Sequence, residues 1–280
     1  MEIIRNKIAL KDAIRRLTAV GKTIGLVPTM GALHAGHLSL VNIAQRHADA
    51  VVATIFVNPT QFGPNEDFTR YPRNEEADTM QLAQAGVQIV YIPSVEEMYE
   101  GDPRTVVSVG DIANALCGAF RPGHFDAVAT VVTKLFMQVM PDIAVFGEKD
   151  YQQLHIIRTF THDLDIPVSI IGGAVIREAD GLALSSRNRY LSETQRRAAA
   201  SLYRALTQAA QAIKAGQEVA AALTDAKDAL MASGFSRIDY IELRDAATLA
   251  PAATLKQPAR LLAAAYLGTT RLIDNIAVEI

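Results

Sequence analysis

The first 176 residues alternate between two patterns of hydrophobic and polar positions. Short β-branched runs predict strands over 24–28, 51–57, 87–92, 143–146 and 168–176. Apolar residues at helical spacing predict helices over 9–20, 38–48, 74–85, 126–140 and 151–163. Asp126 is the expected N-cap of helix 126–140, and Met137 and Met140 are expected in the core. Residues 105–109 are expected to form a minor edge strand or an excursion from the sheet.

Strands that are apolar on both faces and alternate with helices are typical of a parallel, doubly wound sheet. Around residue 177 the pattern changes to Ala-rich helices over 193–215 and 219–233 and strands near 237–243, 260–266 and 272–278. The predicted fold class is therefore α/β. A Rossmann-like doubly wound parallel sheet occupies residues 1–176, and a smaller C-terminal α+β domain occupies residues 177–280. Residues 177–189 are expected to form a mobile lid loop.

Composition narrows the class of protein. Half of the 280 residues are hydrophobic and the net charge is -3, which argues against nucleic-acid binding because phosphate-tracking surfaces need clustered Lys and Arg. The single Cys117 excludes an intramolecular disulfide framework and fits a reducing compartment. No signal peptide is visible, and the longest apolar run, 261–267, is too short to span a bilayer. We expect a cytoplasmic protein with no membrane partner.

The segment His34-Ala-Gly-His37 follows the first predicted strand, where a helix N-terminus offers N–H groups and partial positive charge to phosphate. The spacing of Gly31 and Gly36 superficially matches a phosphate loop, but the Lys and Ser or Thr of that motif are missing. A zinc site lacks partner ligands, so no protein metal ligand is expected. Two surface histidines in a loop remain the alternative.

Polar side chains follow two other predicted strands. Asn58-Pro-Thr-Gln61 places amides where a substrate carboxylate or hydroxyl could bind, although an Asn-Pro turn is the alternative. The stretch 147–153 brings a lysine, carboxylates and amides to a strand end, and a solvated helix cap is the alternative there. Ser185, Ser186 and Arg187 offer donors suited to a triphosphate, or else they form a serine-capped helix start, a role that Ser192 fills better.

Together these stretches resemble the pantothenate synthetase family, a branch of the HIGH-motif nucleotidyltransferase superfamily. The similar stretches are Pro-Thr-Met-Gly-x-Leu-His-x-Gly-His from residue 28, Phe-Val-Asn-Pro-x-Gln-Phe from 56, Arg-Pro-Gly-His-Phe from 121, Phe-Gly-Glu-Lys-Asp-Tyr-Gln-Gln from 146 and Asp-Gly-Leu-Ala-x-Ser-Ser-Arg-Asn from 180. The terminal stretch 271–275 also matches. Leu184 replaces the Met of many relatives, a swap that conserves volume.

The resemblance implies that the chain condenses pantoate with β-alanine through a pantoyl adenylate, consuming ATP and releasing AMP and pyrophosphate. It implies Mg²⁺ held mainly by the ATP phosphates, and a homodimer. The implied catalytic residues are His34, His37, Lys149, Ser185, Ser186 and Arg187. The implied ATP-binding residues are Pro28, Thr29, Met30, Gly31, His34, His37, Gly147, Lys149, Asp150, Ile176, Leu184, Ser185, Ser186 and Arg187. The implied substrate-binding residues are Met30, Asn58, Gln61 and Gln153.

Three other functions compete with this hypothesis. A nucleotidyltransferase would transfer the nucleotide to a phosphate acceptor and leave a stable adduct. An aminoacyl-tRNA synthetase would need a basic RNA-binding extension, which this chain does not show. A nucleotide sensor would bind ATP without turnover, and pantoate-stimulated exchange between ATP and pyrophosphate separates it from an enzyme.

Overall fold

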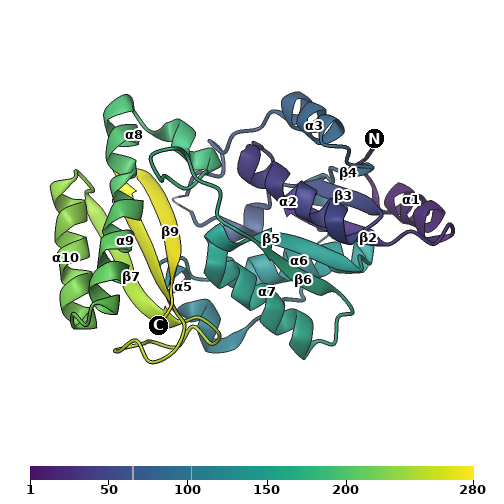
Figure 1. The fold of residues 1–280 in the computed structure, drawn as a ribbon. Helices are drawn as coiled ribbons and strands as arrows, with labels where there is room; N and C mark the ends of the chain where they lie inside the picture. Colours follow the sequence, from purple (N-terminus) through teal and green to yellow (C-terminus); the bar gives the residue numbers. More distant parts are fainter. Residues whose placement is uncertain (65, 102) are drawn as a thin grey trace. The chain divides into compact units, whose positions relative to one another are not determined.

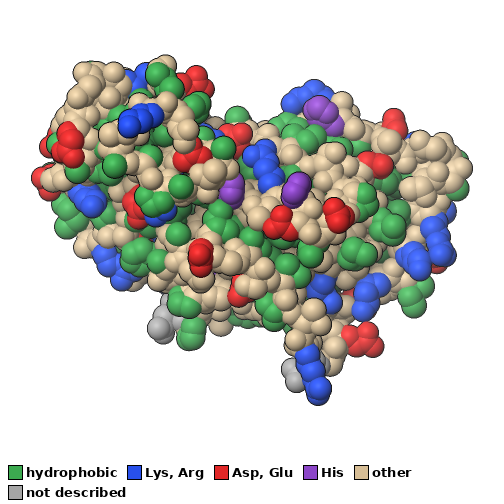
Figure 2. Space-filling model, turned by 90° about the horizontal axis from the view of Figure 1, so that it is seen from below, with side chains coloured by type: hydrophobic (Ala, Val, Ile, Leu, Met, Phe, Trp, Pro, Cys, Tyr) green, Lys and Arg blue, Asp and Glu red, His purple; other side chains and the backbone are tan. Residues whose placement is uncertain are grey.

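The computed structural model describes residues 1–64, 66–101 and 103–280. These residues divide into two compact units, one of residues 1–148 and 153–174 and one of residues 149–152 and 175–280. No described helix is long and apolar enough to cross a membrane. On the face drawn in Figure 2, Lys and Arg side chains lie among Asp and Glu side chains, and no single sign of charge dominates.

The first unit is built on a six-stranded parallel sheet with the order β1-β4-β3-β2-β5-β6 (Figure 1). Its strands are β1 (Glu2–Ile4), β2 (Ile24–Thr29), β3 (Ala50–Ile55), β4 (Ile89–Tyr91), β5 (Ile143–Gly147) and β6 (Ser169–Gly173). From β2 the chain continues to β3 on one side, whereas β5 lies on the other side. The chain therefore changes direction across the sheet between the neighbouring strands β2 and β5, and this place is the topological switch point. Open α/β sheets bind ligands there, at the carboxyl ends of their strands.

Helices connect these strands. They are α1 (Lys7–Thr18), α2 (Ala35–His47), α3 (Glu75–Gln84), α4 (Val95–Met98), α5 (Cys117–Phe120), α6 (His124–Val139) and α7 (Tyr151–Asp163), with 3₁₀ turns η1 (Pro59–Gln61), η2 (Gly110–Asn114) and η3 (Glu148–Asp150). Helix α2 packs on β2, β3 and β5 and buries Leu40, Val41 and Ala44. A Cβ on Gly173 would lie 2.2 Å from Leu40 Cδ2, so glycine allows α2 to approach the end of β6.

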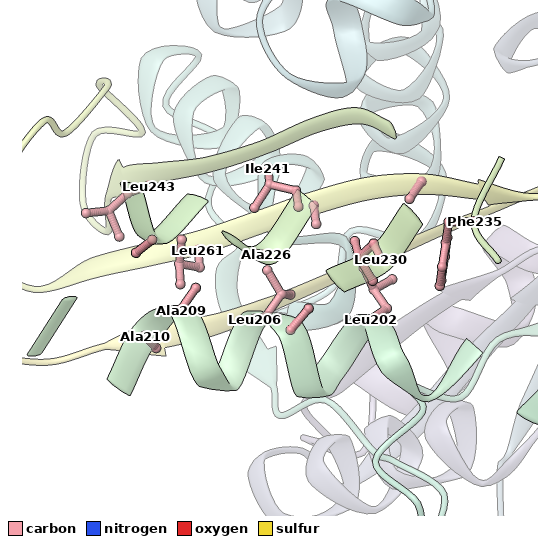
Figure 3. Close-up of a cluster of buried hydrophobic side chains, with 14 of the residues drawn as sticks. Leu202, Leu206, Ala209, Ala210, Ala226, Leu230, Phe235, Ile241, Leu243 and Leu261 are labelled. Carbon is pink, nitrogen blue, oxygen red and sulfur yellow. The ribbon is translucent and has the colours of Figure 1, made fainter. Parts of the chain in front are cut away.

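The second unit pairs helices with an antiparallel sheet of order β7-β8-β9. Its elements are η4 (Ser186–Tyr190), α8 (Glu193–Ala199), α9 (Ser201–Lys214), α10 (Val219–Ala232), β7 (Arg237–Asp245), β8 (Ala259–Leu267) and β9 (Thr270–Val278). Figure 3 shows the core of this unit, in which Leu206 of α9, Leu230 of α10 and Ile241 and Leu261 of the sheet belong to one cluster of buried side chains. Small alanines on the facing helix surfaces allow this close packing.

The α/β fold class and its parallel sheet are confirmed, but several local predictions are wrong. Residues 105–109 form no strand, because Val107 N–H donates to the Thr130 hydroxyl of α6 instead of to another strand. Met137 and Met140 are 65% and 73% exposed, off the buried face of α6. The cap of α6 is Gly123 in the left-handed region at φ 77°, and Asp126 lies within the first turn. The expected helix 193–215 is divided at Ala200.

Candidate active site

The loop between β2 and α2 is held by a buried carboxylate. Asp78, 3% exposed, accepts the backbone N–H groups of Ala32 and Leu33, each at 2.8 Å. Gly31 and Ala32 both have positive φ, 78° and 51°, and this turn directs the N–H groups of Ala32 and Leu33 toward the Asp78 carboxylate. A Cβ on Gly31 would lie 2.8 Å from Asp78 Oδ2, so this position requires glycine both for its conformation and for space.

The predicted ATP-binding residues of β2 anchor the same loop. The Thr29 hydroxyl donates to the Thr54 carbonyl at 2.6 Å and accepts Gly31 N–H at 3.1 Å. Pairing of β2 with β5 stops at Leu26, whereas pairing of β2 with β3 continues to Thr29. Pro28 lies beyond that point and has no N–H to donate. The carboxyl end of β2 is therefore unpaired on its β5 side, at the switch point.

His34 and His37 form the start of α2. His34 is the N-cap, and its Nδ1 accepts Gly36 N–H at 3.1 Å, while His37 Nδ1 accepts His34 N–H at 3.3 Å. The two rings lie 4.1 Å apart between centroids. A neutral imidazole that accepts at Nδ1 carries its proton on Nε2. The capping arrangement therefore assigns both histidines the neutral tautomer that donates through Nε2.

A second cluster follows β3 and surrounds Gln61. Asn58, 1% exposed, donates from Nδ2 to Gln61 Oε1 at 3.2 Å, and Gln61 Nε2 contacts Met30 Sδ at 3.0 Å. Asn58 Oδ1 accepts the Tyr99 hydroxyl at 2.9 Å and the Thr60 hydroxyl at 2.9 Å. Burial raises the pKa of Tyr99 above its ordinary value, so this hydroxyl remains a donor. The structure brings the predicted substrate-binding residues Met30, Asn58 and Gln61 together.

The backbone of Gln61 is held by the Arg121-Pro-Gly-His124 turn before α6. His124 Nδ1 donates to the Gln61 carbonyl at 2.8 Å, and its Nε2 accepts from Arg121 Nη1 at 2.9 Å. Arg121 also forms a bidentate pair with Glu66, 2.6 Å at each oxygen. Burial alone would raise the pKa of Glu66, but the hydrogen bonds and charge of Arg121 lower it below its usual range. The turn before α6 therefore holds the backbone of Gln61 through two hydrogen bonds to its carbonyl, from His124 and Arg121.

Gly147 and Gln153 are the remaining predicted residues of the first unit. Gly147 is the last residue of β5, next to β2 in the sheet, and Gln153 is a half-buried residue of α7. Among the described residues, no group of three or more His, Cys, Asp and Glu is arranged to hold a metal ion.

The other predicted site residues belong to the second unit. Lys149 Nζ lies 3.9 Å from Asp150 Oδ2, and the Lys149 carbonyl accepts Asn275 Nδ2 at 2.9 Å. The Ile176 carbonyl accepts Leu184 N–H at 2.9 Å, at the base of a hairpin. Ser185 caps η4 by accepting Arg187 N–H at 3.3 Å, and Ser186 is 7% exposed. Ser192 caps α8 as expected, so Ser185 and Ser192 each cap the start of a helix.

Sequence reasoning missed the residues that hold the site. Asp78 contacts the loop after β2, Tyr99 contacts Asn58, and Glu66 contacts Arg121. Each of these three residues comes from a stretch without a recognisable motif. A carboxylate on the buried side of a predicted helix was the available signal for Asp78, because such a group needs a partner.

Comparisons with known proteins give one consistent result. The family model described as pantoate-beta-alanine ligase matches residues 2–277. The pantothenate synthetases of Paramagnetospirillum magneticum and Sphingopyxis alaskensis are each 56% identical, over 100% and 99% of this chain and 98% and 100% of their own. The crystal structure of pantothenate synthetase from Thermus thermophilus has a TM-score of 0.95 at 46% identity and full coverage of both chains. The pantoate-beta-alanine ligase of Francisella tularensis, complexed with "Beta-gamma ATP and Beta-alanine", has a TM-score of 0.84 at 35% identity, covering 99% of this chain and 97% of its own.

Proposed function

Because the chain belongs to the pantoate–β-alanine ligase family, we propose roles for its own residues in the reaction of that family. The enzyme condenses pantoate with β-alanine at the expense of ATP. A carboxylate is a poor acceptor for an amine because its oxide is a poor leaving group. We propose that the pantoate carboxylate first attacks the α-phosphorus of ATP, releasing pyrophosphate and forming pantoyl adenylate. The amine of β-alanine then attacks the acyl carbon, and AMP leaves.

In the first step, charge accumulates on phosphate oxygens, so fixed donors are the useful catalysts. We propose that the Nε2–H groups of His34 and His37 donate to these oxygens beside the N-terminus of α2. The observation that carries this proposal is the pair of Nδ1 atoms occupied by backbone N–H groups. It supports a neutral tautomer that is fixed before ATP binds. Pro28, Thr29, Met30 and Gly31 then contribute the loop beneath the nucleotide.

For pantoate, the proposed contacts are the amides of Gln61 and Gln153, which can both donate and accept. The Gln61 amide is oriented by Asn58 and Met30. Since Asn58 Oδ1 already accepts hydrogen bonds from Tyr99 and Thr60, we propose that Asn58 acts mainly by orienting Gln61.

For ATP, we propose that Lys149, Ser185, Ser186 and Arg187 neutralise the departing β- and γ-phosphates. Gly147, Asp150, Ile176 and Leu184 are proposed to contact the adenosine part. The guanidinium and ammonium groups provide the positive charge, and the serine hydroxyls provide donors suited to phosphate oxygens. Mg²⁺ is proposed to travel with ATP, held mainly by its phosphates, as this ion commonly is in phosphoryl-transfer sites.

We also propose that the enzyme is a cytoplasmic homodimer. The use of ATP, which cells keep inside, supports the location. The exposed apolar side chains of Met137 and Met140 at the end of α6 support a protein contact. Light scattering after size exclusion measures the mass in solution, and a monomer at micromolar concentration would contradict the dimer.

The test of the histidine assignment separates the two ring nitrogens. Asn at position 37 supplies an acceptor where Nδ1 lies but no group at Nε2, so His37→Asn keeps the cap and loses the donor. We expect pantoate-dependent ATP–pyrophosphate exchange to fall about 10²–10³-fold, as for a lost oxyanion-hole donor. The exchange rate of His37→Ala should fall as far. The missing cap should also lower its free energy of unfolding by about 1 kcal/mol.

His47 provides the matched control, because it is an exposed histidine in the last turn of the same helix. The exchange rate of His47→Asn should stay within twofold of the wild-type rate. Near-wild-type exchange in His37→Asn and His37→Ala would eliminate the proposed role of this side chain.

A further inference from the structure

A buried ion pair in the second unit lies at the base of the segment that carries Ser185, Ser186 and Arg187. Arg177 donates from Nη1 to Asp274 Oδ2 at 2.7 Å and from Nη2 to Asp274 Oδ1 at 2.9 Å. The Asp274 side chain is 2% exposed, and burial raises the pKa of its carboxyl even though Arg177 acts in the opposite direction. A carboxylate removed from water to this extent requires its partner.

Arg177 connects three parts of the unit. Besides Asp274, its guanidinium donates to the Gly181 carbonyl at 3.0 Å and to the Asn275 carbonyl at 3.2 Å. It also lies 4.0 Å from the ring centroid of Tyr203 in α9. The planar fork of one arginine therefore joins β9 to the tip of the hairpin and to a helix, which a single ammonium group cannot do with the same geometry.

The hairpin held in this way leads directly to the proposed phosphate-binding residues. Arg177 pairs with Ala183 in an antiparallel bridge, and Glu178 N–H donates to the Leu182 carbonyl at 2.8 Å. At the tip, Gly181 has φ 94°, and a Cβ there would lie 2.3 Å from Tyr203. The hairpin is thus held by Arg177 both at its base and at the Gly181 carbonyl, and Tyr203 lies close to its tip, shortly before Ser185.

The strand of Asp274 also reaches Lys149. Asn275, the next residue, donates from Nδ2 to the Lys149 carbonyl at 2.9 Å, and Asp274 Oδ1 accepts Asn275 N–H at 2.7 Å. The positive charge of Lys149 acts on Asp274 as well, lowering its pKa against the larger effect of burial. Two consecutive residues of β9 therefore contact both the hairpin and the backbone of Lys149.

From these contacts we infer that Asp274, acting through Arg177 and through Asn275, is a positioning residue that fixes the 185–187 segment and Lys149 for binding the phosphates of ATP. This inference rests on the proposed function, in which those residues bind phosphate. Asp274 contacts no reacting atom. It acts by holding Lys149 and the 185–187 segment in fixed positions within one unit.

The test variant is Asp274→Asn, which keeps the shape of the side chain and removes its charge and one acceptor. In ATP–pyrophosphate exchange we expect kcat/KM for ATP to fall at least tenfold, while KM for pantoate changes less than twofold. A general loss of folded structure would instead affect both substrates alike. Assays are run well below the unfolding midpoint of each variant.

Asp239 is the matched control, because its side chain is 1% exposed and pairs with Arg271 at 2.8 Å and Arg237 at 3.1 Å in the same sheet. Asp239→Asn should lower stability yet leave kcat/KM for ATP within twofold. If Asp274→Asn does not fold, Arg177→Lys replaces it, because lysine keeps the charge and loses the fork that reaches Gly181 and Asn275. Arg177→Lys is expected to show the same ATP-selective loss.

Lys149→Ala and Arg187→Ala separate this inference from the proposed function. If both keep wild-type kcat/KM for ATP, the proposed phosphate-binding roles fail. If both are impaired while Asp274→Asn and Arg177→Lys are not, the roles stand and the inference is overturned. The inference is also overturned if Asp239→Asn loses as much activity as Asp274→Asn, or if the Asp274→Asn loss falls equally on ATP and pantoate.

Discussion

Replacing Asp78 by asparagine should both destabilise the first unit and impair the chemistry attributed to His34. Asp78 is buried and accepts two backbone N–H groups at 2.8 Å. Asparagine offers one oxygen in place of two. One backbone N–H group then donates to a neutral acceptor, and the other faces the NH₂ group of asparagine and loses its hydrogen bond. A hydrogen bond to a charged acceptor contributes about 1.5–3 kcal/mol, and a buried unsatisfied donor costs about 1–3 kcal/mol. We expect the free energy of unfolding to fall by roughly 2–4 kcal/mol.

The effect on activity follows from the place of the two N–H groups. Ala32 and Leu33 directly precede His34, so a shifted loop displaces the imidazoles from their proposed contacts with the phosphates. Displacements near 1 Å can cost about 10²-fold in rate. We expect ATP–pyrophosphate exchange to fall at least about tenfold at a temperature where the variant is folded.

Urea unfolding followed by circular dichroism measures the first effect, and the exchange assay measures the second. Asp49→Asn is the matched control, because the exposed Asp49 also accepts two hydrogen bonds, from the N–H and hydroxyl of Thr23. Water can replace those hydrogen bonds, so the urea midpoint and the exchange activity of Asp49→Asn should change little. If Asp78→Asn unfolds at the same urea concentration as Asp49→Asn, or keeps full exchange activity, our account of the loop is wrong.

Three further predictions concern the first unit. Tyr99→Phe removes one donor contact to Asn58 and should cost about 1 kcal/mol in unfolding free energy and raise KM for pantoate several-fold, measured by steady-state kinetics. Because the pKa of Glu66 lies below its ordinary value of 4.5, its contribution to stability is present above about pH 4.5 and is lost as pH falls through the lowered value. The difference in melting temperature between wild type and Glu66→Gln should therefore be largest near pH 7 and shrink in acid. Gly173→Ala should destabilise by about 1–3 kcal/mol through contact with Leu40, and Leu40→Val in the same chain should restore part of that loss in urea unfolding.

Residue patterning predicted the elements that pack on both sides of the sheet, because burial on two faces leaves a strong hydrophobic signature. Strand β3, entirely buried over 50–55, is the clearest case. Strand β1 was not predicted, since it has three residues and only Ile4 is buried. Residues 105–109 contain three valines but contact α6 through Thr130, and composition alone cannot distinguish a ladder from such a contact. Met137 follows the buried Phe136, so a shift of one position on the helix moves a side chain to solvent.

Sequence motifs were enough to propose site roles for residues such as His34, Gln61 and Lys149. A role was not predictable where a residue acts on the backbone of another. Asp78 is distant in sequence from Ala32 and Leu33, and only the folded chain shows their contact. The same holds for Arg177 and Asp274, which lie at opposite ends of the second unit's sequence. Long-range pairing of this kind leaves no periodic signature in one sequence.

The two buried aspartates address the same physical problem by different means. A phosphate-binding loop needs N–H groups, hydroxyls and cations held rigidly, yet loops lose much entropy when they are ordered. Asp78 holds its loop through backbone N–H groups, and Asp274 holds its hairpin through Arg177, so each proposed phosphate-binding segment has hydrogen bonds that do not depend on a ligand. Asp78 occupies the N–H groups of Ala32 and Leu33, so the proposed donors to phosphate in this loop are the imidazoles of His34 and His37. If the proposed roles hold, a buried carboxylate that contacts the binding segment and not the ligand increases the precision of a site for anions, even though its own charge is negative.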